Sequence, residues 1–127
     1  MTSVRRIFPT CLLVGFLLTP NSQADTTTTV RAALASGQPA LIEFGAETCS
    51  QCKRMKVVLD GISQRYRGRA HIVQVNVNQD RDVTRRFKIM VIPTLVFFDA
   101  MGREVGRQYG YLDEVAVARK LHELGAR

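Results

Sequence analysis

The sequence predicts an α/β fold in which a central four-stranded mixed sheet is flanked by helices. Two observations lead to this prediction: helical and extended patterns alternate along the chain, and two consecutive strands near its end form a hairpin. Strands joined through a helix are expected to be parallel with a right-handed crossover, whereas a hairpin adds an antiparallel pair. The 127 residues, 46% of them hydrophobic, suffice for one compact core, so one domain is expected.

Residues 1–24 have the composition of a secretory signal peptide. A start that carries two arginines precedes the apolar run Ile7 to Leu18 and a short polar stretch that ends in small side chains. This pattern predicts cleavage after Ala24, which leaves residues 25–127 as the domain. The alternative is an uncleaved membrane anchor, but this apolar run is shorter than the ~20 residues that span a bilayer.

The positive charge of the chain is scattered rather than clustered. The formal net charge is +7, and cleavage would remove Arg5 and Arg6 and no acid, which lowers it to +5. Acidic residues lie between the cations, so nothing resembles a nucleic-acid-binding module and no nucleic-acid partner is predicted. For an exported, periplasmic protein we expect this charge to serve solubility, or docking to an acidic partner or an anionic lipid surface.

The domain is expected to begin with a helix and a buried strand. After Asp25 and four threonines, Val30 to Ala35 combines helix formers with an apolar stripe, and the helix is expected to end before Gly37. The mostly apolar run Ala40 to Ala46 is typical of a buried strand, and Glu43 is its one charged residue.

The middle of the domain is expected to form a helix, a strand and a short helix. From Cys49, apolar residues recur at spacings of three and four until Gly68, which predicts an amphipathic helix. The β-branched, alternating segment His71 to Val77 predicts a second strand. Arg81 to Phe87 is then expected to be a short helix, with Asp80 or Asn78 as its cap.

The last part is expected to form the hairpin and a closing helix. Thr94 to Phe98 and Arg103 to Tyr109 are strand-like segments joined by the tight turn of residues 99–102. Asp113 is the expected cap of a final helix. The apolar residues of that helix are Val115, Val117, Ala118, Leu121 and Leu124.

Two cysteines lie three residues apart where the buried strand meets the following helix. A disulfide between Cys49 and Cys52 closes too small a loop to stabilise the fold much, so a structural role is disfavoured. At a helix start, free N–H groups and the macrodipole stabilise a thiolate and lower its pKa from about 8.5 to roughly 7 or lower. We therefore expect Cys49 to attack and Cys52 to resolve the mixed disulfide. The third cysteine, Cys11, lies in the predicted signal peptide.

Half of a zinc site is the alternative explanation for this cysteine pair. Such a site needs two further ligands, and the remaining candidates are His71 and His122, which are far apart in the sequence. No metal or other cofactor is therefore predicted, and the redox-active Cys49–Cys52 disulfide itself is expected to carry the electrons.

Two segments of the chain closely resemble the thioredoxin superfamily. The first is Glu-Phe-Gly-Ala-Glu-Thr-Cys-Ser-Gln-Cys-Lys at residues 43–53, and the second is Val-Ile-Pro-Thr at residues 91–94, which opens an apolar strand. The resemblance covers essentially all of residues 25–127 and implies a thioredoxin-like fold. The chain is similar to small exported members, including the C-terminal domain of the membrane reductant conveyor DsbD.

The resemblance also implies roles for individual residues. Cys49 would be the attacking cysteine, Cys52 the resolving one, and Pro93 a cis-proline that faces them. With a cis bond, the Ile92 backbone would pair with an extended substrate peptide. Gly110 matches a glycine near the substrate surface, although an ordinary turn glycine explains it equally well.

Glu43 occupies the position of the family's buried acid, six residues before the first cysteine. A carboxylate in an apolar strand is costly to leave charged and unpaired, so its pKa is expected to rise. Glu43 is then a candidate proton acceptor for Cys52 during resolution. The alternatives are a partly exposed edge residue and an ion-pair partner of a helix cation.

The chain also departs from the family pattern around the cysteines. Thr48 replaces the common tryptophan, Gly45 replaces a second aromatic residue, and Ser50 and Gln51 stand where thioredoxins have Gly-Pro. These changes leave the substrate identity and the redox potential open.

The sequence therefore predicts an exported, monomeric thiol:disulfide oxidoreductase that reduces protein disulfides. Such a reductase needs an upstream electron donor, for which a membrane protein is a candidate. The alternative is a peptide-binding or chaperone-like module that has the thioredoxin fold, holds a peptide near Pro93 and has no redox turnover. Peroxide removal is disfavoured because the sequence has no separate peroxidatic arrangement.

Overall fold

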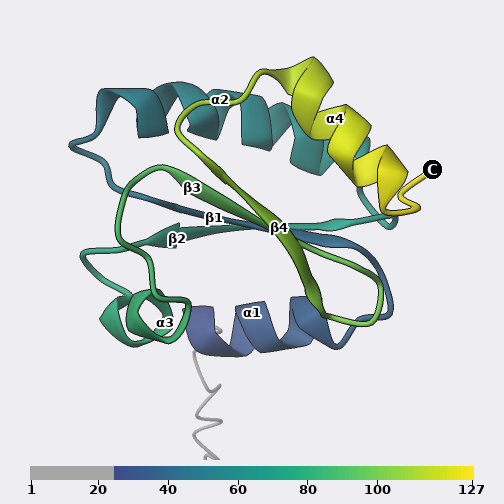
Figure 1. Ribbon diagram of the computed structural model, residues 1–127, viewed down its shortest axis with the longest axis horizontal. Helices are drawn as coiled ribbons and strands as arrows, with labels where there is room; N and C mark the ends of the chain where they lie inside the picture. Colours follow the sequence, from purple (N-terminus) through teal and green to yellow (C-terminus); the bar gives the residue numbers. More distant parts are fainter. Residues whose placement is uncertain (1–24) are drawn as a thin grey trace, which may run out of the picture.

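The computed structural model describes residues 25–127, and the predicted signal peptide lies outside them (Figure 1). The described chain has the predicted order of elements. These are α1 (Thr26–Leu34), β1 (Ala40–Gly45), α2 (Ser50–Arg65), β2 (His71–Asn76), α3 (Arg81–Arg86), β3 (Thr94–Phe98), β4 (Glu104–Tyr109) and α4 (Glu114–Glu123). The sheet order is β2-β1-β3-β4, with one parallel and two antiparallel pairings. The predicted α/β fold with a four-stranded mixed sheet is confirmed.

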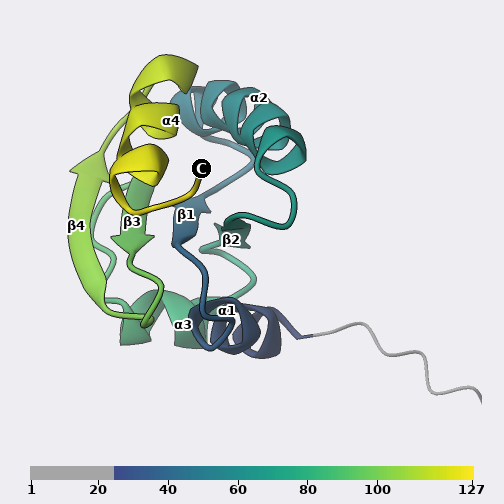
Figure 2. The same cartoon turned by 90° about the vertical axis from the view of Figure 1, so that its right-hand side faces the viewer.

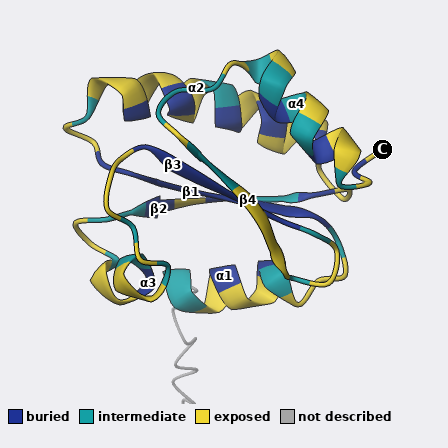
Figure 3. Ribbon diagram, viewed as in Figure 1, coloured by how far each residue is buried: buried dark blue, intermediate teal, exposed yellow. Residues whose placement is uncertain are grey.

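The sheet lies between two layers of helices. Helices α2 and α4 cover one face, and α1 and α3 cover the other (Figures 1 and 2). Because side chains alternate along a strand, β1 sends Leu41 into the α2/α4 core and Ile42 into the α1/α3 core. Strands β1 and β3 are buried along their whole length, whereas β4 is largely exposed (Figure 3). No helix within residues 25–127 is long and apolar enough to cross a membrane.

The prediction that strands joined through a helix are parallel is confirmed for β1 and β2, which α2 joins. It is wrong for β2 and β3, which α3 joins. Strand β3 pairs antiparallel with β1, and it therefore runs opposite to β2. The reason is the length of α3: six residues rise only about 9 Å, which is less than the length of a strand. The connection through α3 stays at one end of the strands, so β3 starts at the end of the sheet where β2 stops.

One local prediction needs correction, and one helix face is narrower than its apolar residues suggest. Helix α1 begins at Thr26 rather than Val30, because the carbonyl of Asp25 already accepts a hydrogen bond from the N–H of Thr29 at 3.0 Å. In α4, Val115 is 68% exposed, whereas Val117 and Leu121 are fully buried. The buried pair is four residues apart on one helix face, and Val115 points away from that face.

Strand β4 is an edge strand with an irregular register. Its pairing with β3 shifts between Phe97 and Phe98, which marks a bulge or a similar irregularity. Glu104 and Arg107 of β4 form an ion pair with each other. Two strands, β1 and β3, separate this edge from β2, which forms the opposite edge of the sheet.

Candidate functional site

The chain brings the predicted site residues to one end of the inner strands β1 and β3. Strand β1 ends at Gly45, and the following loop leads to Cys49 at the start of α2. In the antiparallel pairing of β1 with β3, Phe44 lies opposite Thr94. Pro93, which precedes Thr94, therefore lies at the same end of the strands as the cysteine-bearing loop.

The two cysteines form a disulfide in which they have different environments. Their Cα atoms are 5.2 Å apart. Cys49 is the N-cap of α2, and its Sγ accepts a hydrogen bond from the backbone N–H of Cys52 at 3.2 Å. Cys49 is partly exposed, whereas Cys52 is only 5% exposed. The outer sulfur thus lies at a helix N-terminus, where an anion is stabilised.

The Val-Ile-Pro-Thr segment at residues 91–94 contains a cis peptide bond between Ile92 and Pro93. The hydroxyl of Thr94 donates a hydrogen bond to the carbonyl of Val91 at 2.7 Å. The N–H of Gly110 donates to the carbonyl of Pro93 at 2.8 Å. Pro93 itself is buried, whereas Ile92 is 37% exposed.

Gly110 lies between the cis-proline segment and the cysteine helix. Its φ of +79° is in the left-handed region, which favours glycine. A Cβ at this position would lie 3.6 Å from Oε1 of Gln51, the residue before Cys52. The glycine therefore serves the turn and also leaves the surface beside the cysteines without a side chain.

Glu43 is buried at 4% exposure in the inner strand β1. Burial raises its pKa to about 7, although the charge of Lys56 opposes this rise. Its Oε1 is enclosed and accepts no hydrogen bond within residues 25–127. The alternative of an exposed edge residue is wrong, and no ion pair in the described part of the chain involves Glu43.

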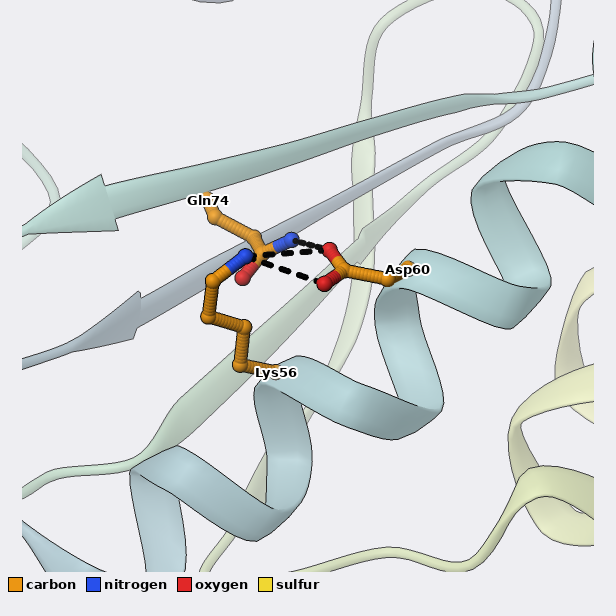
Figure 4. A network of polar contacts seen from close by, with 3 residues as sticks. All are labelled: Lys56, Asp60 and Gln74. Carbon is orange, nitrogen blue, oxygen red and sulfur yellow. Dashed lines mark hydrogen bonds and ion pairs between the residues drawn. The ribbon is translucent and has the colours of Figure 1, made fainter.

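Three polar residues near Glu43 were not found from the sequence. Lys56 and Asp60 of α2 approach Gln74 of β2, and the three side chains point toward one another (Figure 4). Lys56 Nζ lies 3.0 Å and 3.2 Å from the carboxylate oxygens of Asp60, and Gln74 Nε2 donates to Asp60 at 2.9 Å. These hydrogen bonds lower the pKa of Asp60. Lys56 and Asp60 are four residues apart, so their ion pair could have been predicted from the sequence. The contact with Gln74 could not, because it depends on the register of β2 in the sheet.

The two histidines considered as zinc ligands belong to separate elements of the fold. His71 begins β2, and His122 lies near the end of α4 on the surface. Across the described part of the chain, no group of three or more His, Cys, Asp and Glu side chains is placed to hold a metal ion.

Comparison with known proteins identifies the family. The thioredoxin family model matches residues 21–123. Thioredoxin 1 of Nostoc sp. is 29% identical over 102 residues, covering 80% of this chain and 94% of that protein. The thioredoxin of Alicyclobacillus acidocaldarius is 33% identical over 79 residues, covering 62% of this chain and 74% of that protein.

A solved structure supports the fold independently. The crystal structure of chloroplastic thioredoxin z has a TM-score of 0.67 and 23% identity, and the match covers 77% of this chain and 88% of that one. With a Cys-x-x-Cys disulfide at the start of α2, this protein belongs to the thioredoxin family and is a thiol:disulfide oxidoreductase.

Proposed function

We propose that the protein reduces disulfides of other proteins, with Cys49 as the attacking and Cys52 as the resolving residue. The different exposure of the two sulfur-bearing residues supports this assignment most directly. Partly exposed Cys49 is accessible to a client disulfide, and the N–H of Cys52 that points at its Sγ favours the thiolate. Buried Cys52 is less accessible to a client and suits an internal second step.

The proposed reaction has two balanced exchanges. The Cys49 thiolate attacks one sulfur of the client disulfide, and the other client sulfur leaves with the bonding electron pair. Cys52 then gives its proton to the Glu43 carboxylate and attacks Cys49, which forms the Cys49–Cys52 disulfide and releases the second client thiolate. The client is reduced and the cysteine pair is oxidised. Because its pKa is about 7, Glu43 exchanges a proton readily near neutral pH.

The client is proposed to bind beside Pro93 and Gly110. Ile92 is 37% exposed beside Pro93, so its backbone is available to an extended peptide. Such a peptide can pair with it as an added strand would. The missing side chain at Gly110 gives the client space close to Gln51.

The direction of electron flow is tested by equilibrating the purified protein with glutathione buffers and quantifying the reduced fraction after acid quenching and alkylation. The small domain has no insertion such as enlarged oxidants carry, so we expect a reductant. Its potential should be nearer the roughly −270 mV of thioredoxin than the roughly −120 mV of the strong oxidant DsbA. A value near the latter would contradict the reductase assignment.

We also propose that the protein is exported to the periplasm as a monomer and receives electrons there from a donor, with a membrane protein as the candidate. The support is the charged start, the apolar run and the polar stretch before Asp25. Expression of the full chain should yield a periplasmic product whose intact mass is that of a chain beginning at Asp25. Light scattering should give the mass of one chain. Retention of residues 1–24 on a membrane-bound product would contradict cleavage, and a doubled mass would contradict the monomer.

A further inference from the structure

A groove lies between α1 and α3, on the face of the sheet opposite to the cysteine-bearing helix α2 (Figures 1 and 2). Its volume is about 320 Å³, at the lower end of the roughly 300–1,000 Å³ that is usual for small-molecule sites. The lining residues that matter here are Val30, Arg31, Leu34, Val83, Arg86 and Phe87. The groove is therefore built from the two helices that take no part in the redox site.

Each helix turns one face toward the groove. On α1, Arg31 and Leu34 are three residues apart and Val30 and Leu34 are four apart. Val83, Arg86 and Phe87 of the α3 segment have the same spacing of three and four. Residues with this spacing share a helix face, so each wall combines apolar side chains with one arginine.

The apolar walls are held in place from behind. Val30 and Val83 are buried in the core under this face of the sheet. The ring of Phe87 packs against that of Phe44 with centroids 5.3 Å apart. The carbonyl of Phe87 accepts a hydrogen bond from Arg107 of β4 at 2.8 Å. The groove is thus formed before a ligand arrives, which lowers the cost of ordering its walls on binding.

The charge of the groove is positive and unneutralised. Arg31 and Arg86 are exposed and line it, and no acidic residue of the described chain does. Neither arginine forms an ion pair within residues 25–127, and Asp82 of α3 pairs with Arg85 instead. The predicted signal peptide contains no acidic residue either. Both guanidinium groups are therefore available to a carboxylate, which matches their fork of N–H donors.

We propose that the groove between α1 and α3 binds one fatty acid anion. The carboxylate pairs with Arg31 and Arg86, and the hydrocarbon chain lies along the apolar wall that includes Leu34 and Phe87. An inorganic anion would leave this wall uncovered, and an uncharged hydrocarbon would leave the arginines unpaired. The site lies on the other face of the sheet from α2 and does not depend on the proposed disulfide reduction.

Isothermal titration calorimetry of the purified protein with sodium decanoate tests the site. One decanoate should bind per chain. From hexanoate to decanoate, the affinity should rise about fourfold for each added CH₂ group that the groove buries. Decanol has the same chain without the charge and should bind about fivefold or more weakly, because the ion pairs are lost. No saturable decanoate binding, or equal affinities for decanoate and decanol, would overturn the proposal.

Replacing the arginines locates the carboxylate. Arg31→Gln and Arg86→Gln should each weaken decanoate binding about fivefold, which is the worth of one exposed ion pair. The matched control is Arg119→Gln, which removes the same charge from an exposed position on α4, in the opposite helix layer. Thermal melting establishes that each variant is folded. Equal decanoate affinities in the three variants would contradict the proposed site.

Nuclear magnetic resonance locates the hydrocarbon chain. In ¹H–¹⁵N spectra, decanoate should shift the amide signals of Leu34 and Phe87 and leave those of Cys49 and Ile92 in place. Shifts confined to the signals near Cys49 would place the ligand at the redox site and overturn the groove.

Vesicles of phosphatidylglycerol distinguish a bound fatty acid from a membrane surface. Cosedimentation with these vesicles that both arginine variants lose, together with no decanoate binding, would show that the arginines dock on a bilayer and that the proposal is wrong. Decanoate binding that depends on Arg31 and Arg86 would support the proposal. Because these readouts measure binding, they stand even if insulin reduction is undetectable and the proposed function fails.

Discussion

Replacing Cys49 with serine is expected to lower disulfide reduction to the rate measured without protein, whereas Cys52→Ser should stop the reaction halfway. A serine hydroxyl is not ionised near neutral pH, so the first exchange with the client cannot begin. With Cys52→Ser, Cys49 can still attack, but nothing inside the protein resolves the mixed disulfide. The measurements are insulin reduction and non-reducing mass spectrometry of the trapped product.

The two variants serve as controls for each other because each replaces one sulfur by oxygen within the same helical turn. A mixed disulfide should accumulate with Cys52→Ser and be absent with Cys49→Ser, and its mass should identify the client and the electron donor. Trapping through Cys52 alone would reverse the assigned roles. If Cys49→Ser kept full biological activity and the unmodified protein did not reduce insulin, the chaperone-like alternative would be the better description.

The free energy of unfolding of the oxidised protein is expected to fall by about 3 kcal/mol between pH 4.5 and pH 7, and Glu43→Gln should abolish this fall. The pKa of Glu43 is about 7 in the folded protein, and its ordinary value is 4.5. Above pH 4.5 the unfolded chain loses this proton while the folded protein keeps it, so folding becomes less favourable as pH rises. Each pH unit in this window is worth about 1.4 kcal/mol until Glu43 ionises near pH 7.

Urea unfolding at several pH values, followed by circular dichroism, measures this dependence. Asp99→Asn is the matched control, because hydrogen bonds from Arg103 lower the pKa of Asp99 and its contribution is lost only as pH falls below its ordinary value of 3.8. The Asp99→Asn variant should therefore keep the fall between pH 4.5 and pH 7. An unchanged pH dependence in Glu43→Gln would show that Glu43 is not the group responsible.

Most of the fold follows from local sequence patterns, but the direction of one strand does not. Thr94 to Phe98 matches the prediction at both ends, because the turn after it and Pro93 before it leave little freedom. The antiparallel direction of β3 depends on the short α3, which keeps the chain at one end of the strands. Local periodicity carries no information about that return path.

In the candidate site, too, some features follow from the local sequence and others depend on the tertiary fold. The burial of Glu43 could be predicted because its neighbours in the strand are apolar, and the position of Cys49 could be predicted from the change to helical spacing. The small cavity between β1, α2 and β2, which Glu43, Cys52 and Gln74 line, could not be predicted, because it depends on which residues of α2 and β2 lie beside β1. That information arises only from the strand register and the packing of the helix onto the sheet.

The irregular edge strand β4 bears on how the protein avoids aggregation. An open, regular edge offers a template to any unfolded chain, and disulfide exchange brings such chains close. The shifted register between Phe97 and Phe98 interrupts that template. The charges of Glu104 and Arg107, which pair with each other, disfavour pairing of a second strand with β4. If extended clients bind at the ends of β1 and β3 as proposed, β4 at the sheet edge remains a poor nucleus for intermolecular sheets.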